Sequence, residues 1–273
     1  MIKASHGILV GYDGSSSSQQ ALRWAAREAR ERGVVLTVCH AWTEGYAGPP
    51  STGDPDDATR RGAEWVLDSG LRMTGADDVR PMLIEGPAAR MLCENSQDSD
   101  MVVIGSRGLG GLSGLLLGSV SLQVAAHASA PVVVVRGHWR PAGAFAPGPV
   151  VVGADGSAVS DAALAFAGEE AALRRARLVA VCALSDAPGD LGAAHHIEAD
   201  FEQSLTIWEK EHPEVAVERQ VTTRSARSAL LDAAQDAQLL VIGRRGRGGI
   251  PDMRLGSVSH ALLWHASCPV AVV

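Results

Sequence analysis

The residues with the clearest chemical potential are glycines and serines in a spacing that occurs twice. Residues 105–119 read GSRGLGGLSGLLLGS and residues 243–257 read GRRGRGGIPDMRLGS, so both fit glycine, two residues, glycine, nine residues, glycine, serine. A glycine-rich turn between a strand and a helix exposes backbone amides, and the start of the helix adds partial positive charge. This pattern predicts phosphate binding. The candidate residues are Gly105, Gly108, Gly118 and Ser119, with Ser121 in the same opening turn, and in the second copy Gly243, Gly246, Gly256 and Ser257.

An aspartate stands at a matching place before each glycine-rich segment. Asp13 lies in ILVGYDGS and Asp155 in VVVGADGS, each after a β-branched run. A carboxylate at the end of a strand can accept hydrogen bonds from ribose hydroxyls or an exocyclic amine. The same Asp-Gly-Ser order also makes a turn and a helix cap without any ligand. Because the first and fourth strands are neighbours in many doubly wound sheets, the aspartate and the glycine loop could flank one crevice, with nucleoside at one side and phosphates at the other.

The chain is a tandem duplication. The glycine-rich copies lie 138 residues apart and the two aspartates 142 apart, and each half has the size of an independent domain. A segment rich in proline and glycine, RGHWRPAGAFAPGP at 136–149, separates them. We therefore predict a first domain at 1–137, a linker at 138–148 and a second domain at 149–273.

Apolar runs that are continuous rather than alternating predict strands covered on both faces, as in a parallel sheet wound with helices. The predicted strands are 8–12, 34–41, 79–84, 101–105 and 131–135, and then 150–154, 178–184, 215–221, 239–243 and 269–273. In the first half, helical patterns follow the first strand and recur near 60–75, 87–97 and 119–128. One segment in each half is expected to be a loop, 47–57 in the first and 185–192 in the second. The predicted fold class is α/β, with two Rossmann-like domains, each a five-stranded parallel sheet wound with about four helices.

Charge and motifs exclude several functions. The net charge of −7 disfavours a broad electrostatic grip on nucleic acid or an anionic membrane. No apolar stretch has the length of a signal peptide or a membrane span, so we expect a cytoplasmic protein. The sequence has no GxxxxGK[ST] motif, its first loop does not give GxGxxG, and it lacks the SGGxDS pattern of adenylating ATP pyrophosphatases. Binding is therefore better supported than catalysis.

The remaining cysteines and histidines favour structural roles. The four cysteines are widely spaced in mostly apolar surroundings, which is typical of buried free thiols. His127 and His265 match each other near the end of the last helix of each half, where a histidine can cap carbonyls. His195 and His196 are unmatched in the first half and do not make a metal site without further ligands.

Together, the Asp-Gly-Ser turn, the repeated glycine loop and the closing PVVVV and PVAVV strands resemble the universal stress protein family in its tandem two-domain form. The segment GSRGLGGLSGLLLGSVS is very similar to the loop of the ATP-binding branch of that family. The resemblance implies ATP, usually with Mg²⁺, and an intrachain pseudo-dimer that can pair again as a homodimer. It implies that Asp13 contacts the adenosine, that Ala41 offers its backbone to adenine, and that Gly105, Gly108, Gly118, Ser119 and Ser121 hold the phosphates. The matching second set is Asp155, approximately Leu184, Gly243, Gly246, Gly256, Ser257 and Ser259.

The second loop departs from this pattern. Pro251 stiffens its backbone and Asp252 adds a negative charge near the expected phosphates. Four arginines act in the opposite sense, namely Arg244, Arg245, Arg247 and Arg254. The sequence leaves the occupancy of the second site open.

The leading functional hypothesis is an ATP-binding stress-response regulator or sensor that acts with an unidentified protein partner and has little or no ATP turnover. Slow hydrolysis stays open, because a true ATPase needs a positioned base or water-orienting group that the repeated core does not clearly show. The alternative from another class is a scaffold or chaperone-like interaction protein whose glycine loops bind no nucleotide.

Overall fold

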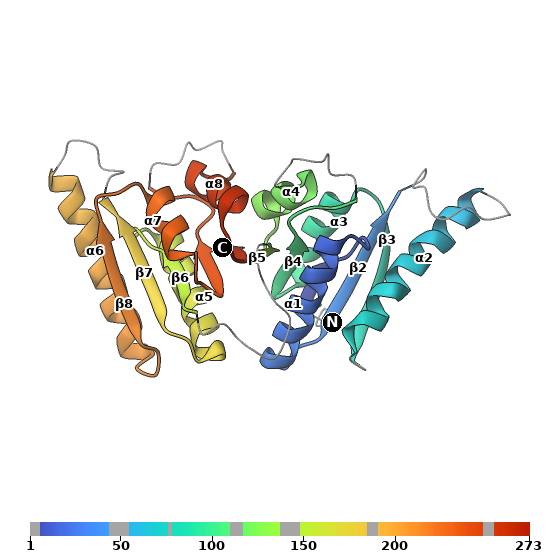
Figure 1. The fold of residues 1–273 in the computed structure, drawn as a ribbon, viewed down its shortest axis with the longest axis horizontal. Helices are drawn as coiled ribbons and strands as arrows, with labels where there is room; N and C mark the ends of the chain where they lie inside the picture. The colour runs from blue at the N-terminus through green and yellow to red at the C-terminus, as the bar shows by residue number, and fades with distance from the viewer. Residues whose placement is uncertain are drawn as a thin grey trace. The chain divides into compact units, whose positions relative to one another are not determined.

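The chain divides into two compact units, Met1–Val135 and Arg136–Val273 (Figure 1). The computed structural model describes residues 6–43, 55–75, 78–109, 117–136, 148–184, 191–247 and 254–273. Both units have the same order of strands and helices, as a tandem duplication requires. The domain and linker boundaries expected from the sequence stay a prediction, because most of the expected linker, residues 137–147, lies outside the described ranges.

The first unit is a parallel sheet in the order β3-β2-β1-β4-β5. Helices α1 and α2 pack together, as do α3 and α4, and the two pairs cover opposite faces of the sheet (Figure 1). The strand order changes direction between β1 and β4, and the carboxyl ends at such a switch point form the usual ligand crevice. The elements are β1 Ile8–Gly11, α1 Ser16–Arg32, β2 Leu36–Trp42, α2 Pro55–Thr74, β3 Val79–Glu85, α3 Ala88–Asn95, the 3₁₀ turn η1 Ser96–Asp98, β4 Met101–Gly105, α4 Ser119–His127 and β5 Val132–Val135.

The second unit repeats this sheet in the order β10-β9-β6-β7-β8, again with parallel pairing throughout. Its switch point lies between β6 and β9. The elements are β6 Val150–Gly153, α5 Ala158–Arg174, β7 Leu178–Ala183, α6 Leu191–Glu211, β8 Val217–Thr222, α7 Ala226–Ala233, β9 Leu239–Ile242, α8 Ser257–His265 and β10 Val270–Val272. The predicted fold class, two Rossmann-like α/β domains, is confirmed.

Local sequence explains how the first helix of each unit begins. In α1 the Ser15 hydroxyl accepts the N–H of Ser18, and in α5 the Ser157 hydroxyl accepts the N–H of Ser160. Each serine thus satisfies one of the amide donors that a helix start leaves open. A stripe of small and apolar residues is buried on both helices, namely Ser18, Ala21, Leu22, Ala25 and Ala29, and Ser160, Ala163, Leu164, Ala167 and Ala171.

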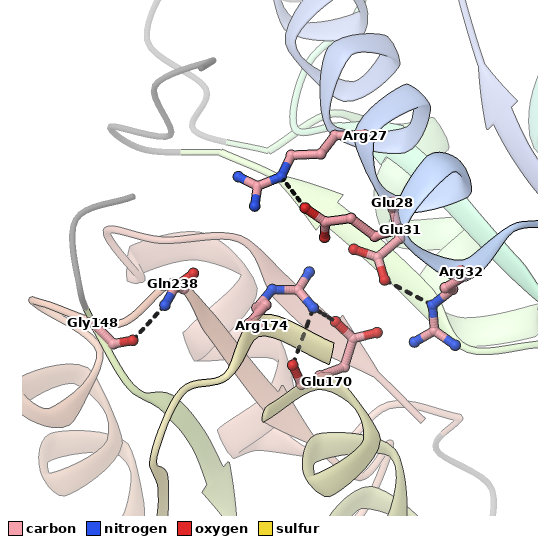
Figure 2. Close-up of polar contacts among 8 residues, drawn as sticks. All are labelled: Arg27, Glu28, Glu31, Arg32, Gly148, Glu170, Arg174 and Gln238. Atoms are coloured by element: carbon pink, nitrogen blue, oxygen red, sulfur yellow. Dashed lines mark hydrogen bonds and ion pairs between the residues drawn. The ribbon is translucent and has the colours of Figure 1, made fainter. Parts of the chain in front are cut away.

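The same two helices each carry a buried carboxylate paired one turn along with an arginine. Arg32 Nε lies 2.7 Å from Glu28 Oε1, and Arg174 Nη1 pairs with Glu170 in the same spacing (Figure 2). The side chains of Glu28 and Glu170 are 2% and 0% exposed. Figure 2 also shows Gln238, whose side-chain amide donates to the Gly148 carbonyl at 2.6 Å and ties the segment before β6 to the turn before β9.

Two predicted loops are shorter than expected. Helix α2 begins at Pro55, so residues 55–57 were wrongly predicted as loop, and α6 begins at Leu191, so residues 191–192 were too. Proline is well suited to the first helical position because its missing N–H would have no partner there, so a proline-rich composition fits both a loop and a helix start. The rest of both loops, residues 47–54 and 185–190, lies outside the described ranges.

Candidate functional site

Asp13 joins the turn after β1 to the glycine-rich loop after β4. Its Oδ1 accepts the N–H of Ser15 at 3.0 Å, and its Oδ2 accepts the N–H of Leu109 at 3.1 Å. The first bond is the turn chemistry expected of an Asp-Gly-Ser sequence. The second connects residues 96 positions apart. The structure therefore brings Asp13 and the start of the glycine loop together at the switch point of the first sheet.

Two glycines of the loop are required by close approach. A Cβ on Gly108 would lie 2.6 Å from Asp13 Oδ2, and a Cβ on Gly105 would lie 2.6 Å from the carbonyl carbon and the hydroxyl of Ser17. Gly118 is different, because its nearest atoms would lie 3.5 Å from an added Cβ. Its N–H donates to the Ser106 carbonyl at 2.7 Å and closes the base of the loop. Nine residues separate Gly108 from Gly118, and seven of them, residues 110–116, lie outside the described ranges.

Helix α4 starts at Ser119, where the spacing predicted it, with Gly118 as N-cap. Gly118 has no side chain, so none caps the amides of the opening turn. A helix start with such amides attracts an anion through the N–H groups and the helix dipole. In the second unit α8 starts in the same way at Ser257, with Gly256 as N-cap.

The Ser121 side chain is bonded to the start of the glycine loop. Its side chain is buried, and its hydroxyl donates to the Gly105 carbonyl at 2.8 Å. A phosphate oxygen only accepts hydrogen bonds, and the single hydroxyl proton is already donated to Gly105. The phosphate contact that the family resemblance implies for Ser121 stays a prediction, and in this structure the hydroxyl proton is directed to Gly105. Ser259 donates to the Gly243 carbonyl at the same distance, so the second unit has the same arrangement.

Sequence reasoning missed two serines beside the first loop. The Ser17 hydroxyl accepts the N–H of Arg107 at 3.2 Å and lies 3.4 Å from the Ser106 hydroxyl. The run of four serines after Asp13-Gly14 was the available signal. In the second unit the positions of Ser17 and Ser106 hold Val159 and Arg244.

Ala41 lies near the carboxyl end of β2, the strand next to β1. The neighbouring His40 is buried, and its Nδ1 lies 2.8 Å from the Tyr12 carbonyl, just before Asp13. Burial lowers the pKa of His40, against the opposing effects of this hydrogen bond and the charge of Asp13. Because a carbonyl can only accept, Nδ1 carries the proton in this contact. His40 thereby fixes the turn in front of Asp13.

The second unit reproduces this frame. Asp155 Oδ1 accepts the N–H of Ser157 at 3.0 Å, and Oδ2 accepts the N–H of Arg247 at 3.1 Å. A Cβ on Gly246 would lie 3.2 Å from Asp155 Oδ2. Burial alone would raise the pKa of Asp155, but hydrogen bonds from Ser157, the Arg247 backbone and Ser160 together lower it. The carboxylate is therefore ionised near neutral pH.

The strand register corrects one predicted residue. Gly11 pairs with Cys39 in the first sheet, and the matching Gly153 pairs with Val181 in the second. The counterpart of Ala41, two residues further along, is Ala183, the last residue of β7. The sequence prediction of approximately Leu184 was therefore displaced by one residue.

The other histidines and the cysteines have no place in these sites. His127 Nδ1 lies 2.8 Å from the Gln123 carbonyl in the last turn of α4, as predicted for a helix end. His195 and His196 lie on α6, and no group of three metal-ligating side chains occurs among the described residues.

All four cysteines are free, three of them buried and Cys93 half-buried. Burial raises the pKa of the Cys39, Cys182 and Cys268 thiols to about 12. The helices of the described ranges include none that is long and apolar enough to cross a bilayer.

Fold and site together define a tandem α/β protein in which each domain joins an Asp-Gly-Ser turn to a glycine-rich loop at the switch point of a parallel sheet. The model of the universal stress protein family matches residues 5–136 and 148–273, and the chain belongs to this family.

Curated relatives agree over nearly the full length. The chain is 36% identical to Universal stress protein Rv2005c of Mycobacterium tuberculosis, over 99% of this chain and 97% of that protein. It is also 36% identical to a universal stress protein of Mycolicibacterium smegmatis, with 98% and 97% covered. The crystal structure of a universal stress protein from Archaeoglobus fulgidus shares the fold with a TM-score of 0.72 at 21% identity, covering 97% of this chain and 95% of that one.

Proposed function

We propose that this universal stress protein binds an adenine nucleotide in its first domain and acts as a nucleotide-dependent regulator of the stress response with little or no ATP turnover. The observation that carries the proposal is the hydrogen bond from the Leu109 N–H to Asp13 Oδ2, which joins the two loops at the switch point of the sheet. A nucleoside and its phosphates need two such loops on either side of one crevice. The resemblance of the first loop to the ATP-binding branch of the family supports ATP as the ligand.

Each residue has a proposed role. Asp13 contacts the adenosine through the lone pairs that its two amide bonds leave unused, and the Ala41 backbone contacts adenine. The phosphates lie against the backbone at Gly105 and Gly108 and against the opening turn of α4 at Gly118 and Ser119. Ser121 positions this turn through Gly105. The same assignment, with Asp155, Ala183, Gly243, Gly246, Gly256 and Ser257, is proposed for the second domain.

Magnesium would bind through the nucleotide rather than through a protein cage. Among the described residues no three acidic, histidine or cysteine side chains gather to hold a metal ion. Mg²⁺ commonly keeps several waters and binds the phosphates of its nucleotide, with few protein ligands. We propose the Ser119 hydroxyl, in the opening turn of α4, as a protein oxygen that could reach the ion or the phosphates.

Binding fits this geometry better than turnover does. Phosphoryl transfer needs a group that positions the attacking water and a positive charge at the terminal phosphate. Asp13 is the carboxylate at the switch point of the first sheet, and both of its oxygens already accept backbone amides. We therefore propose that nucleotide occupancy, not hydrolysis, carries the signal to an unidentified protein partner. The intrachain pseudo-dimer, its pairing as a homodimer and the cytoplasmic location stay predictions.

The proposal is tested by identifying the nucleotide released when the freshly purified protein is denatured. We expect an adenine nucleotide, and we expect Asp13→Ala to weaken its rebinding by about ten- to hundredfold, because a hydrogen bond to a charged group contributes about 1.5–3 kcal/mol. Asp155→Ala is the matched control, since it makes the same change in the other domain and should leave the first site intact. Absence of released nucleotide, together with no binding of added Mg-ATP, would exclude the proposal and favour the scaffold alternative.

A further inference from the structure

Arg247 makes contacts in the second domain that its counterpart in the first domain cannot make. Its backbone N–H donates to Asp155 Oδ2, as that of Leu109 does to Asp13. Its side chain continues beyond this shared bond. Nε donates to the Asp155 carbonyl at 2.7 Å, and Nη2 pairs with Asp200 Oδ2 on α6 at 2.6 Å. The guanidinium thus spans from the glycine loop across the Asp155 turn to helix α6.

Helix α6 is packed close enough to receive this bridge. A Cβ on Gly156, which follows Asp155, would lie 2.5 Å from the Cβ of Asp200. In the first domain the matching Gly14 faces Val66 of α2 at 3.8 Å from an added Cβ, and the Leu109 side chain is 60% exposed. The first domain therefore has the apolar residues Leu109 and Val66 where the second domain has the ion pair between Arg247 and Asp200.

We infer that Arg247 is a phosphate-dependent strap and the specificity-determining residue of the second site. In the resting protein Asp200 is its counter-ion and the strap crosses the side of the crevice where Asp155 faces the nucleoside. When a phosphorylated ligand binds, the Arg247 guanidinium leaves Asp200 and pairs with a phosphoryl group, which opens the strap. An uncharged nucleoside offers the guanidinium no such partner. This inference rests on the proposed function, because it assigns the phosphates to the same crevice.

The energies of the two states permit this exchange. The side chains of Arg247 and Asp200 are 35% and 47% exposed, and ion pairs at such exposure stabilise a protein by only about 0–1 kcal/mol. A guanidinium binds phosphate through parallel hydrogen bonds and meets more negative charge there than on one carboxylate. The backbone bond to Asp155 holds the Arg247 Cα in place, so only the side chain has to move. Opening also releases Asp200, and with it one tie between α6 and the loop.

The experiment uses the full chain and sodium tripolyphosphate, a probe that carries phosphoryl charge without a nucleoside. Hydrogen exchange is followed separately in peptides from α6 and from α2, which distinguishes the two domains. We expect tripolyphosphate to increase exchange in α6 of the wild-type protein, because the strap is released. We expect Arg247→Leu, which restores the residue type of the first domain, to abolish this response. Asp200→Asn should increase exchange in α6 without ligand and strengthen tripolyphosphate binding by about two- to fivefold.

A matched control removes an exposed ion pair at the amino-terminal ends of the strands of the same sheet, away from the glycine loop. Arg177 precedes β7 and pairs with Glu218 of β8, so Arg177→Leu changes the charge equally but should leave the α6 response as in wild type. If tripolyphosphate leaves α6 exchange unchanged, or Asp200→Asn leaves the affinity unchanged, the strap is excluded even though the first site still binds ATP. A different result separates the two proposals. If Asp13→Ala leaves ATP binding unchanged while Arg247→Leu still abolishes the α6 response, the nucleotide assignment of the first domain is wrong and the role of Arg247 is supported.

Discussion

At the scale of single residues, Gly105 and Gly118 frame the same loop but differ in what requires them to be glycine. Gly105 lies where β4 meets the start of α1, and its missing Cβ leaves room for the Ser17 backbone. Gly118 has an ordinary backbone conformation, with φ −81°, and room for a methyl group. Packing therefore accounts for Gly105, whereas Gly118 is favoured as an N-cap residue and is proposed to approach the phosphates.

We expect Gly105→Ala to lower the free energy of unfolding of the first domain by about 1–3 kcal/mol, the usual cost of forcing an extra carbon into a packed site. Gly118→Ala should cost less than about 1 kcal/mol, since it only replaces one N-cap residue by a poorer one. Urea unfolding of both variants measures the difference. Equal stabilities would show that the Ser17 segment moves aside freely and that the contact does not constrain the loop.

The sequence predicted the glycines and aspartates of the site but not the side chains that lock them together. The spacing of the loop places Gly105 and Gly118 correctly because turn and cap signals are local. The Ser121 hydroxyl could not be assigned in this way, since its partner is the Gly105 carbonyl 16 residues earlier. The Arg247–Asp200 pair joins residues 47 positions apart through the packing of α6, and no local pattern records it.

At the scale of elements, the apolar runs predicted all five strands of each sheet, and the composition signal is strong in the inner strands because these are buried on both faces. The edge strands β3 and β8 are partly exposed. The helix starts at Pro55 and Leu191 were missed, since proline, glycine and aspartate suit both loops and first helical turns. The paired charges of α1 and α5 were missed as well. Their spacing of four residues is ordinary for an exposed helix face, and only the packed structure shows that Glu28 and Glu170 are buried.

This burial makes the ion pair of α5 sensitive to loss of its cation. We expect Arg174→Ala to lower the free energy of unfolding by about 3–5 kcal/mol, because Glu170 keeps its charge in a buried position. Arg32→Ala should cost less, because the Arg32 side chain is 22% exposed against 5% for Arg174, so water can reach that pair. The double variant Glu170→Leu with Arg174→Met should recover most of the loss, as apolar replacements of buried pairs often do. Unfolding by urea tests the series, and a loss below about 1 kcal/mol for Arg174→Ala would contradict the argument.

At the scale of the whole molecule, duplication has kept the backbone frame and changed the side chains around it. In both domains one aspartate accepts the amide of the turn serine and the amide of the residue after the second glycine of the loop. Around that frame the first domain has Ser17 and Ser106, and the second has Val159 and Arg244. Under the proposed function, two sites with one frame and different linings would give one chain two ligand affinities, and the protein would respond over a wider range of ligand concentration than either site alone.

We therefore expect ATP to occupy the second site before the first, because binding there exchanges the weak pair between Arg247 and Asp200 for a stronger contact of Arg247 with phosphate. At ATP about a hundredfold above the dissociation constant of the first site, binding should stabilise the first domain by about 2.7 kcal/mol. Hydrogen exchange with increasing Mg-ATP should then slow in peptides spanning β9 at lower concentrations than in peptides spanning β4. In Arg247→Leu the two midpoints should move together, whereas Arg177→Leu should leave their separation unchanged. Coincident midpoints in the wild-type protein would show that the two linings do not set affinity, and the asymmetry between the domains would then need another origin.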